Sequence, residues 1–214
     1  MGTARWWVSL PPGSSGDLPV VVALHGHGGS ADGLLGAYHL DSALAASGHR
    51  FAIAAIDGGA EGFWHPRADG RDPLHLLLEA FLPALKDYAL RPAGLIGWSM
   101  GGYGALLADS LLPSKEKLPV CAVSPGILLR YADAPEWAFD GPDDFRRWDL
   151  RKRWDLDPEL VRVDCGTEDG LYPAVRRFAE EKGLSLNSAP GGHDLDYWLP
   201  LVPSQLDWLA ERIG

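Results

Sequence analysis

The sequence predicts an α/β fold in which a mostly parallel central sheet carries helices on both faces. Short apolar runs rich in Val, Ile and Leu recur along the chain, and longer stretches with helical periodicity separate them. Strands that are apolar throughout are typical of parallel sheets buried on both faces. The 214 residues are 46% hydrophobic, which is enough for a substantial core, so we expect residues 1–214 to form a single domain.

The expected elements alternate along the chain. The strands are residues 20–24, 51–56, 93–98, 120–124, 161–165 and 184–189, and residues 4–10 are a candidate antiparallel edge strand. The helices are residues 34–46, 74–90, 102–112, 172–182 and 203–213, with Gly48 and Gly183 as C-terminal stop signals. Residues 131–158 fit no βα unit, and they are a candidate small flap or cap.

Composition excludes several classes of function. The net charge of −10 would repel a phosphate backbone, so we expect no nucleic-acid partner. Cys121 and Cys165 lie in apolar stretches, which favours free buried thiols over a disulfide or a zinc site. No stretch has the roughly 18 apolar residues of a membrane span, and Pro11, Pro12 and Gly13 interrupt the start of the chain before any apolar signal core. We therefore expect a cytoplasmic protein.

A motif for nucleophilic catalysis follows the expected strand at residues 93–98. Gly97-Trp98-Ser99-Met100-Gly101 matches Gly-x-Ser-x-Gly, a pattern that by itself often occurs by chance. Here an apolar strand precedes it and a helix rich in small residues follows, which is the context of a nucleophile elbow. A serine on such a sharp turn needs tiny neighbours on both sides, and Gly97 and Gly101 meet that need. Ser99 is therefore the candidate nucleophile.

A serine nucleophile requires a histidine base and a carboxylate behind it. Of the seven histidines only His193 lies beyond Ser99, in a glycine-rich loop after an expected strand. Asp169 is the preferred acid, because it follows the strand at 161–165 and active sites gather at the carboxyl ends of parallel strands. Glu168 and Asp194 remain alternatives for that role.

Acyl transfer also needs two N–H donors for the oxyanion. The residue after the nucleophile supplies one, so the backbone N–H of Met100 is the first candidate. His25-Gly26-His27-Gly28-Gly29 follows the strand at 20–24, and we assign the second donor to the backbone N–H of His27. With no third ligand nearby, His25 and His27 do not make a metal site, and no metal or cofactor is expected.

These stretches resemble the esterase D and feruloyl esterase branch of the α/β-hydrolase superfamily, which includes mycolyltransferases and S-formylglutathione hydrolases. The most specific match is Ser-Met-Gly-Gly-Tyr-Gly-Ala-Leu at residues 99–106. Further matches are residues 24–29, 57–59, 165–169 and 191–198, so the resemblance spans most of the chain. It implies the α/β-hydrolase fold, a Ser99, His193 and Asp169 triad, and an oxyanion hole at His27 and Met100. The chain differs from these relatives in being short, so we expect only a minimal cap.

Two aromatic features remain open after the motifs are assigned. Residues 131–158 mix aromatic side chains with nearly balanced acidic and basic ones, which favours a solvated, salt-bridged flap over an anion-binding patch. Trp64 and Trp198 lie close in sequence to the expected active-site loops and are candidates for an aromatic acyl pocket. Aromatic side chains are more often part of the core, so the core is the favoured interpretation for both.

The sequence thus predicts a carboxylesterase-type serine hydrolase that cleaves small-molecule esters or thioesters through an acyl-enzyme on Ser99. An acyltransferase on the same scaffold, in which an alcohol replaces water, is one alternative. A non-catalytic binding protein that keeps the hydrolase fold is the other, and the presence of all three triad residues argues against it.

Overall fold

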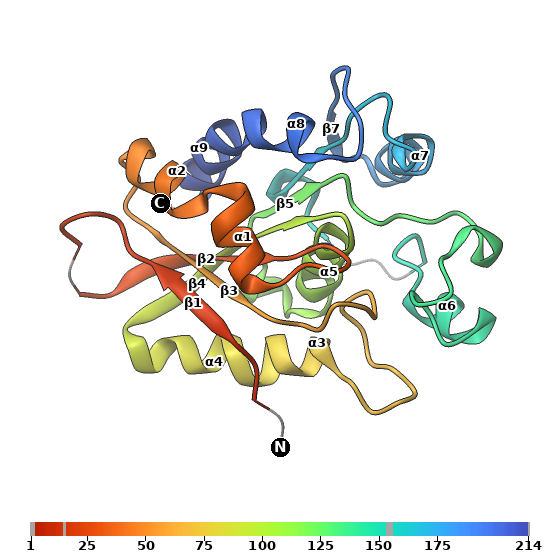
Figure 1. The fold of residues 1–214 in the computed structure, drawn as a ribbon, viewed down its shortest axis with the longest axis horizontal. Coiled ribbons are helices and arrows are strands. Elements are labelled where there is room, and N and C mark those ends of the chain that lie inside the picture. Colours follow the sequence, from red (N-terminus) through yellow and green to blue (C-terminus); the bar gives the residue numbers. More distant parts are fainter. Residues whose placement is uncertain (1–2, 15, 153–155, 214) are drawn as a thin grey trace.

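The computed structural model describes residues 3–14, 16–152 and 156–213. In this part of the chain, seven strands form one twisted sheet in the order β1-β3-β2-β4-β5-β6-β7 (Figure 1). Strand β1 pairs antiparallel with β3, and the other neighbours are parallel. The strands are β1 Trp6–Ser9, β2 Leu18–Leu24, β3 Ala52–Ile56, β4 Leu90–Trp98, β5 Val120–Val123, β6 Val161–Asp164 and β7 Ser185–Asn187.

Helices connect these strands. The α-helices outside residues 73–88 are α1 Ala31–Tyr38, α2 Leu40–Ser47, α5 Met100–Leu111, α6 Pro142–Trp148, α7 Tyr172–Lys182, α8 Leu195–Trp198 and α9 Val202–Ile213. Residues 73–88 form one helical path made of α3 Pro73–His75, the π-helical η1 Leu76–Phe81, α4 Leu82–Ala84 and the 3₁₀-helical η2 Leu85–Tyr88. Further 3₁₀ turns are η3 Ser114–Glu116, η4 Tyr131–Asp133, η5 Pro158–Leu160 and η6 Leu199–Leu201. None of the helices described is long and apolar enough to cross a membrane.

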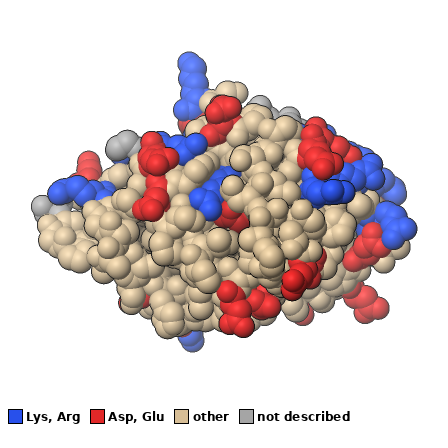
Figure 2. Space-filling model, turned by 90° about the horizontal axis from the view of Figure 1, so that it is seen from above, with Lys and Arg blue, Asp and Glu red and all other residues tan. Residues whose placement is uncertain are grey.

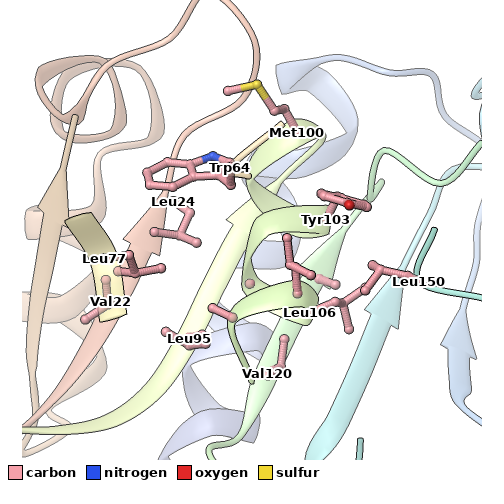
Figure 3. Close-up of a cluster of buried hydrophobic side chains, with 14 of the residues drawn as sticks. Val22, Leu24, Trp64, Leu77, Leu95, Met100, Tyr103, Leu106, Val120 and Leu150 are labelled. Carbon is pink, nitrogen blue, oxygen red and sulfur yellow. The ribbon is translucent and has the colours of Figure 1, made fainter. Parts of the chain in front are cut away.

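The two faces of the sheet bury two separate cores. Along β2, Val20 and Val22 face one core and Val21 faces the other, as the two-residue period of a strand requires. The first core packs against α5, α7 and the helical path at 73–88, and the second packs against α1, α2, α8 and α9. Figure 1 shows α1, α2 and α9 on one side of the sheet and α3 and α4 on the other. Figure 3 shows side chains of the first core between the strands and α5.

The prediction of a single helix at residues 34–46 is wrong, because two helices, α1 and α2, occupy this stretch. His39 adopts a left-handed conformation with φ of 50°, which ends α1 and starts α2 in a new direction. The break lets Leu34 of α1 and Leu40 and Leu44 of α2 all enter the second core. A straight helix has one narrow apolar stripe, so two short helices cover the curved sheet more completely.

The helix expected at residues 74–90 also needs correction at its end. The helical path stops at Tyr88, Ala89 takes a left-handed conformation with φ of 57°, and Leu90 already belongs to β4 opposite Leu18. Within the path, Pro83 has no N–H to donate, and the π-helical turn η1 comes directly before α4, which contains it. The predicted edge strand and helix α7 are confirmed.

A close crossing of three backbone segments positions the end of β4. A Cβ atom on Gly97 would collide with the carbonyl of Gly101, and one on Gly101 would collide with the carbonyl of Leu24 at the end of β2. Helix α5 can therefore start directly above β2 and β4 only because both positions are glycine. This crossing brings the first turn of α5 beside the loop that follows β2.

Replacing Gly101 by Ala is expected to lower the free energy of unfolding by at least about 2 kcal/mol, because neither colliding partner is a side chain that can rotate away. Gly36→Ala is the matched control. Gly36 is exposed in α1 and a Cβ there meets nothing within 4 Å, so alanine should add about 0.5–1 kcal/mol. Urea unfolding of both variants tests this, and a Gly101→Ala protein as stable as wild type would contradict the crossing.

Candidate active site

Ser99 occupies the turn between β4 and α5 in a conformation that is rare for serine. Its φ is 54° and its ψ is −117°, and the side chain is half-buried. Three backbone hydrogen bonds hold the turn: Ser99 N–H donates to Val123 O at 2.9 Å, and the Ser99 carbonyl accepts from Gly126 N–H at 2.9 Å and from Tyr103 N–H at 3.1 Å. Strained backbone that persists against such a cost is common at functional sites.

Ser99, His193 and Asp169 lie in one hydrogen-bonded chain. The Nε2 atom of His193 is 2.9 Å from Ser99 Oγ, and its Nδ1 atom is 2.7 Å from Asp169 Oδ2. An ionised carboxylate only accepts, so Nδ1 carries a proton and Nε2 of the neutral ring is left to accept from the serine hydroxyl. The Asp169 side chain has no exposed area, whereas 34% of the His193 side chain is exposed to solvent.

The loops that carry His193 and Asp169 meet because the pairing of β6 with β7 continues past both strands. Three backbone bonds extend it, from Cys165 N to Asn187 O, Thr167 N to Ala189 O and Glu168 N to Gly191 O, at 3.1, 2.9 and 3.0 Å. At the crossing a Cβ on Gly166 would collide with the Gly191 carbonyl. The loops of Asp169 and His193 are therefore placed by one extended set of backbone hydrogen bonds.

The structure distinguishes the three candidate carboxylates. Glu168 is exposed, and Asp194 caps α8 by accepting from Tyr197 N–H at 3.1 Å. Asp169 alone of the three contacts the His193 ring. Burial pushes the pKa of Asp169 upward, but hydrogen bonds from His193, from Leu171 N–H at 2.8 Å and from the Ser124 hydroxyl outweigh it and hold the pKa below its usual range.

The loop after β2 passes directly beside the serine. A Cβ on Gly26 would lie 3.5 Å from Ser99 Cβ, and the next residue along the loop is His27. The loop itself is held by Gly28 N–H, which donates to Ala60 O at 2.8 Å. Met100 is the first residue of α5, where a backbone N–H has no acceptor within the helix. Both predicted oxyanion donors therefore belong to segments that flank Ser99.

His25 has a structural role in this loop. It is buried, its Nε2 accepts from Gly58 N–H at 3.1 Å and its Nδ1 donates to Gly26 O at 2.9 Å, so one neutral tautomer satisfies both contacts. Burial lowers the pKa of His25, which agrees with a neutral ring. His25 thus joins the loop after β2 to the loop after β3.

Comparison with known proteins bears on the fold. No protein-family model matches the sequence, and no curated protein sequence matches it. Among solved structures, a ferulic acid esterase is 21% identical with a TM-score of 0.77, and the match covers 99% of this chain and 93% of that one. This chain has the α/β-hydrolase fold.

Two further α/β-hydrolase structures are similar along nearly their whole length. An S-formylglutathione hydrolase from Agrobacterium tumefaciens is 19% identical, with a TM-score of 0.76 and coverage of 98% of this chain and 90% of that one. A fluorophosphonate-binding serine hydrolase from Staphylococcus aureus is 15% identical, with a TM-score of 0.71 and coverage of 98% and 99%. The strand order and mostly parallel pairing described above agree with this fold.

A cavity of about 440 Å³ opens beside Ser99. Its walls come from the loop after β2, from α1, from Ser99 and His193 and from two tryptophans. They consist of His25, Gly26, His27, Gly29, Ser30, Gly33, Leu34, Ala37, Tyr38, Ser99, Trp137, His193 and Trp198. Trp198 thus lines the cavity. Trp64 does not: it is 1% exposed, donates its indole N–H to His25 O at 3.1 Å and packs in the first core over Leu24 (Figure 3).

The segment predicted as a flap supplies one wall of this cavity. The ring of Trp137 stacks on the His27 ring, with centroids 3.6 Å apart and planes 9° from parallel. Arg151 pairs with Asp149 within this segment, and Arg130, directly before it, pairs with Asp133, as expected for a salt-bridged flap. The expectation of a solvated flap is wrong for its aromatic side chains, since Phe139, Phe145 and Trp148 are buried in the first core. Arg153, Trp154 and Asp155 lie outside the described residues.

Two residues of the loop after β3 attach this segment. Arg67 donates to Trp137 O at 2.6 Å and pairs with Asp140 at 2.9 Å, and only 6% of its side chain is exposed. The buried His65 ring stacks between Phe139 and Trp148, and its Nε2 atom is 3.1 Å from Ala138 O. The position of Trp137 in the cavity wall therefore depends on contacts that Arg67 and His65 make with the backbone of its segment.

Sequence reasoning missed Tyr38 and Ser124 and left Trp137 without a role. Tyr38 lines the cavity from the last turn of α1, against Trp98 and Trp198 with ring centroids 4.6 and 6.1 Å away. No local pattern marks any of the three, because each reaches the site through contacts between distant segments. Only the density of tryptophans in residues 131–158 was a visible signal.

Charged side chains are mixed on the face seen in Figure 2. Acidic and basic residues lie side by side near its rim, and the middle is mostly uncharged. Nothing on this face resembles the continuous basic stripe that tracks a nucleic-acid backbone.

We expect the ionised Asp169 carboxylate to stabilise the fold, since its pKa in the folded protein is lowered. That stability is present above the ordinary carboxyl pKa of about 3.9 and is lost as the pH falls through the lower folded value. Melting temperatures from about pH 3 to pH 7 should therefore fall less on acidification in Asp169→Asn than in wild type. Glu168→Gln, which removes an exposed carboxylate from the same loop, should follow the wild-type curve. Parallel curves for wild type and Asp169→Asn would contradict this.

Proposed function

We propose that this protein is a carboxylesterase-type serine hydrolase that cleaves carboxylic esters or thioesters through an acyl-enzyme on Ser99. The observation that carries the proposal is the hydrogen-bonded chain from Ser99 Oγ through His193 to the buried Asp169. The names of the compared structures, a ferulic acid esterase, an S-formylglutathione hydrolase and a fluorophosphonate-binding serine hydrolase, support the same class of reaction.

The geometry suits acylation of the serine. His193 Nε2 takes the hydroxyl proton as Ser99 Oγ attacks the carbonyl carbon, and Asp169 stabilises the imidazolium that forms. The carbonyl oxygen becomes an oxyanion that accepts from the N–H groups of His27 and Met100. His193 then returns the proton to the leaving alcohol or thiol, and the acyl group stays on Ser99.

Hydrolysis completes the cycle. The partly exposed His193 ring takes a proton from a water molecule, the hydroxide attacks the acyl carbon, and Ser99 Oγ leaves with the proton that His193 returns. An alcohol in place of water would give acyl transfer instead. Chromatography of the products formed from one ester in the presence of a competing alcohol separates the two outcomes.

The substrate of this reaction is a small-molecule ester whose acyl or leaving group fits the cavity. A volume of about 440 Å³ lies in the lower part of the range of ordinary ligand pockets. Leu34, Ala37, Tyr38, Trp137 and Trp198 make most of its wall apolar and aromatic, so the group that enters it is uncharged.

Ser99→Ala and His193→Ala should both abolish labelling by a fluorophosphonate probe, because the first lacks the nucleophile and the second lacks its base. Turnover of p-nitrophenyl acetate should fall by about 10⁴-fold or more in each. Ser110→Ala is the matched control: this serine lies in the last turn of α5, and its hydroxyl donates only to Leu107 O, at 2.7 Å. Labelling that survives in Ser99→Ala would place the nucleophile elsewhere.

Trp137→Ala should raise KM for p-nitrophenyl butyrate about tenfold with a much smaller change in kcat, since it removes a cavity wall and none of the proton-transfer groups. Trp6→Ala, at an exposed tryptophan of β1, provides the comparison for loss of an indole remote from Ser99. Equal KM values for wild type and Trp137→Ala would show that the substrate does not touch this wall.

A further inference from the structure

Ser124 is a buried serine that the reaction above does not use. It follows β5 directly, it is 0% exposed, and its φ of 43° is in the left-handed region. Its neighbours are tied to the elbow, because Ser99 N–H donates to Val123 O and Gly126 N–H donates to Ser99 O, both at 2.9 Å. A strained, buried polar residue beside the nucleophile turn calls for a physical explanation.

Trp198 determines which way the Ser124 hydroxyl points. The indole Nε1–H of Trp198 donates to Ser124 Oγ at 3.0 Å, and an indole nitrogen can only donate. Ser124 Oγ is therefore an acceptor in that contact, and its single proton is left for another acceptor. Two acceptors lie near it, since the Ser124 hydroxyl acts to lower the pKa both of the Asp169 carboxylate and of the Cys165 thiol. Burial raises the pKa of the thiol to about 12, so the sulfur stays protonated and is a weak acceptor, and the ionised carboxylate is the stronger acceptor of the two.

The same tryptophan also contacts the base. The Trp198 and His193 rings meet edge to face, with centroids 4.9 Å apart and an interplanar angle of 81°. Trp198 thus touches the histidine with its ring and reaches the carboxylate through Ser124 with its N–H group. The contacts therefore form a ring that runs from His193 to Asp169, Ser124, Trp198 and back to His193.

We propose that Ser124, oriented by Trp198, is a positioning residue for the Asp169 and His193 pair. Its hydroxyl occupies one lone pair of the Asp169 carboxylate, so that Oδ2 stays aimed at His193 Nδ1 while Leu171 N–H holds Oδ1. Trp198 has a double role, since it also forms part of the cavity wall. This inference rests on the proposed function, because it assigns residues that support the same triad.

Other titratable groups face Asp169 and must be separated from it in a pH experiment. Burial raises the pKa of the Cys165 thiol and of the Tyr197 hydroxyl, each to about 12, so neither ionises near neutral pH. Asp164 is paired with Arg162 at 3.0 Å and accepts from Gln205 at 2.9 Å. A change in the acidic limb of a rate profile therefore reports on the Asp169 and His193 pair.

The test compares kcat and KM for p-nitrophenyl acetate across pH in wild type, Ser124→Ala and Ser124→Gly. Both variants should lose about tenfold in kcat, the size of one hydrogen bond to a charged group, with little change in KM because Ser124 does not line the cavity. The acidic limb should move to higher pH, because Asp169 loses a donor that lowers its pKa. Glycine accepts positive φ without strain, so equal losses in both variants assign the effect to the hydroxyl.

Trp198→Phe tests the orienting contact, because phenylalanine keeps an aromatic ring against His193 and removes the N–H group. We expect a loss of about threefold in kcat, and the double variant with Ser124→Ala should be no slower than Ser124→Ala alone. Additive losses would overturn the claim that Trp198 acts through Ser124. Ser110→Ala, which also loses a serine hydrogen bond, should leave kcat and the acidic limb unchanged.

A measurement that needs no substrate turnover tests variants whose kcat is too low to measure. The proton on His193 Nδ1 lies in the short hydrogen bond to Asp169, so its ¹H resonance is expected far downfield. Trp198→Phe and Ser124→Ala should both move it, and an unmoved resonance with wild-type kcat would refute the Ser124 assignment. If Ser99→Ala remains active, the proposed function itself fails; if only the Ser124 variants behave as wild type, the triad stands and the positioning role falls.

Discussion

The active site depends on a crossing of backbones that leaves no room for side chains. Helix α5 begins where β4 ends, and its first turn presses on the carbonyls of Leu24 and Gly97, so Gly97 and Gly101 cannot carry a Cβ. At this crossing Ser99 has a strained backbone with φ of 54° and ψ of −117°, as expected for the sharp turn between a strand and a helix. It also brings the loop after β2 beside Ser99, so the candidate oxyanion donors lie on both sides of the candidate nucleophile.

Burial and hydrogen bonding have opposite effects on the pKa of Asp169. Desolvation alone would favour a neutral Asp169, yet the groups around it are donors, and they keep the carboxylate ionised. Each donor comes from a different segment: His193 from the loop after β7, Leu171 from the start of α7 and Ser124 from the end of β5. The charge is thus stabilised only when those segments are assembled, which couples the chemistry of the site to the packing of the sheet.

The cavity is shaped by contacts outside the triad. Trp137 stacks on His27 of the loop after β2 while Arg67 and His65 contact the backbone of its segment. Tyr38 enters from the last residue of α1. Trp198 connects the two regions, since it lines the cavity and contacts both His193 and Ser124. The shape of the cavity and the surroundings of His193 therefore depend partly on the same side chain.

The sequence by itself determined the alternation of strands and helices, because the spacing of apolar residues differs between them. It also determined the sharp turn at Ser99, which glycines flank, and the one histidine that follows Ser99 in the chain. The tertiary structure alone decided that Asp169 rather than Glu168 contacts His193, that Trp198 rather than Trp64 lines the cavity, and that Trp137 meets His27. Neighbouring residues such as Glu168 and Asp169 share one local pattern. Which of them turns inward depends on how loops distant in sequence pack against each other, and a local pattern carries no information about that packing.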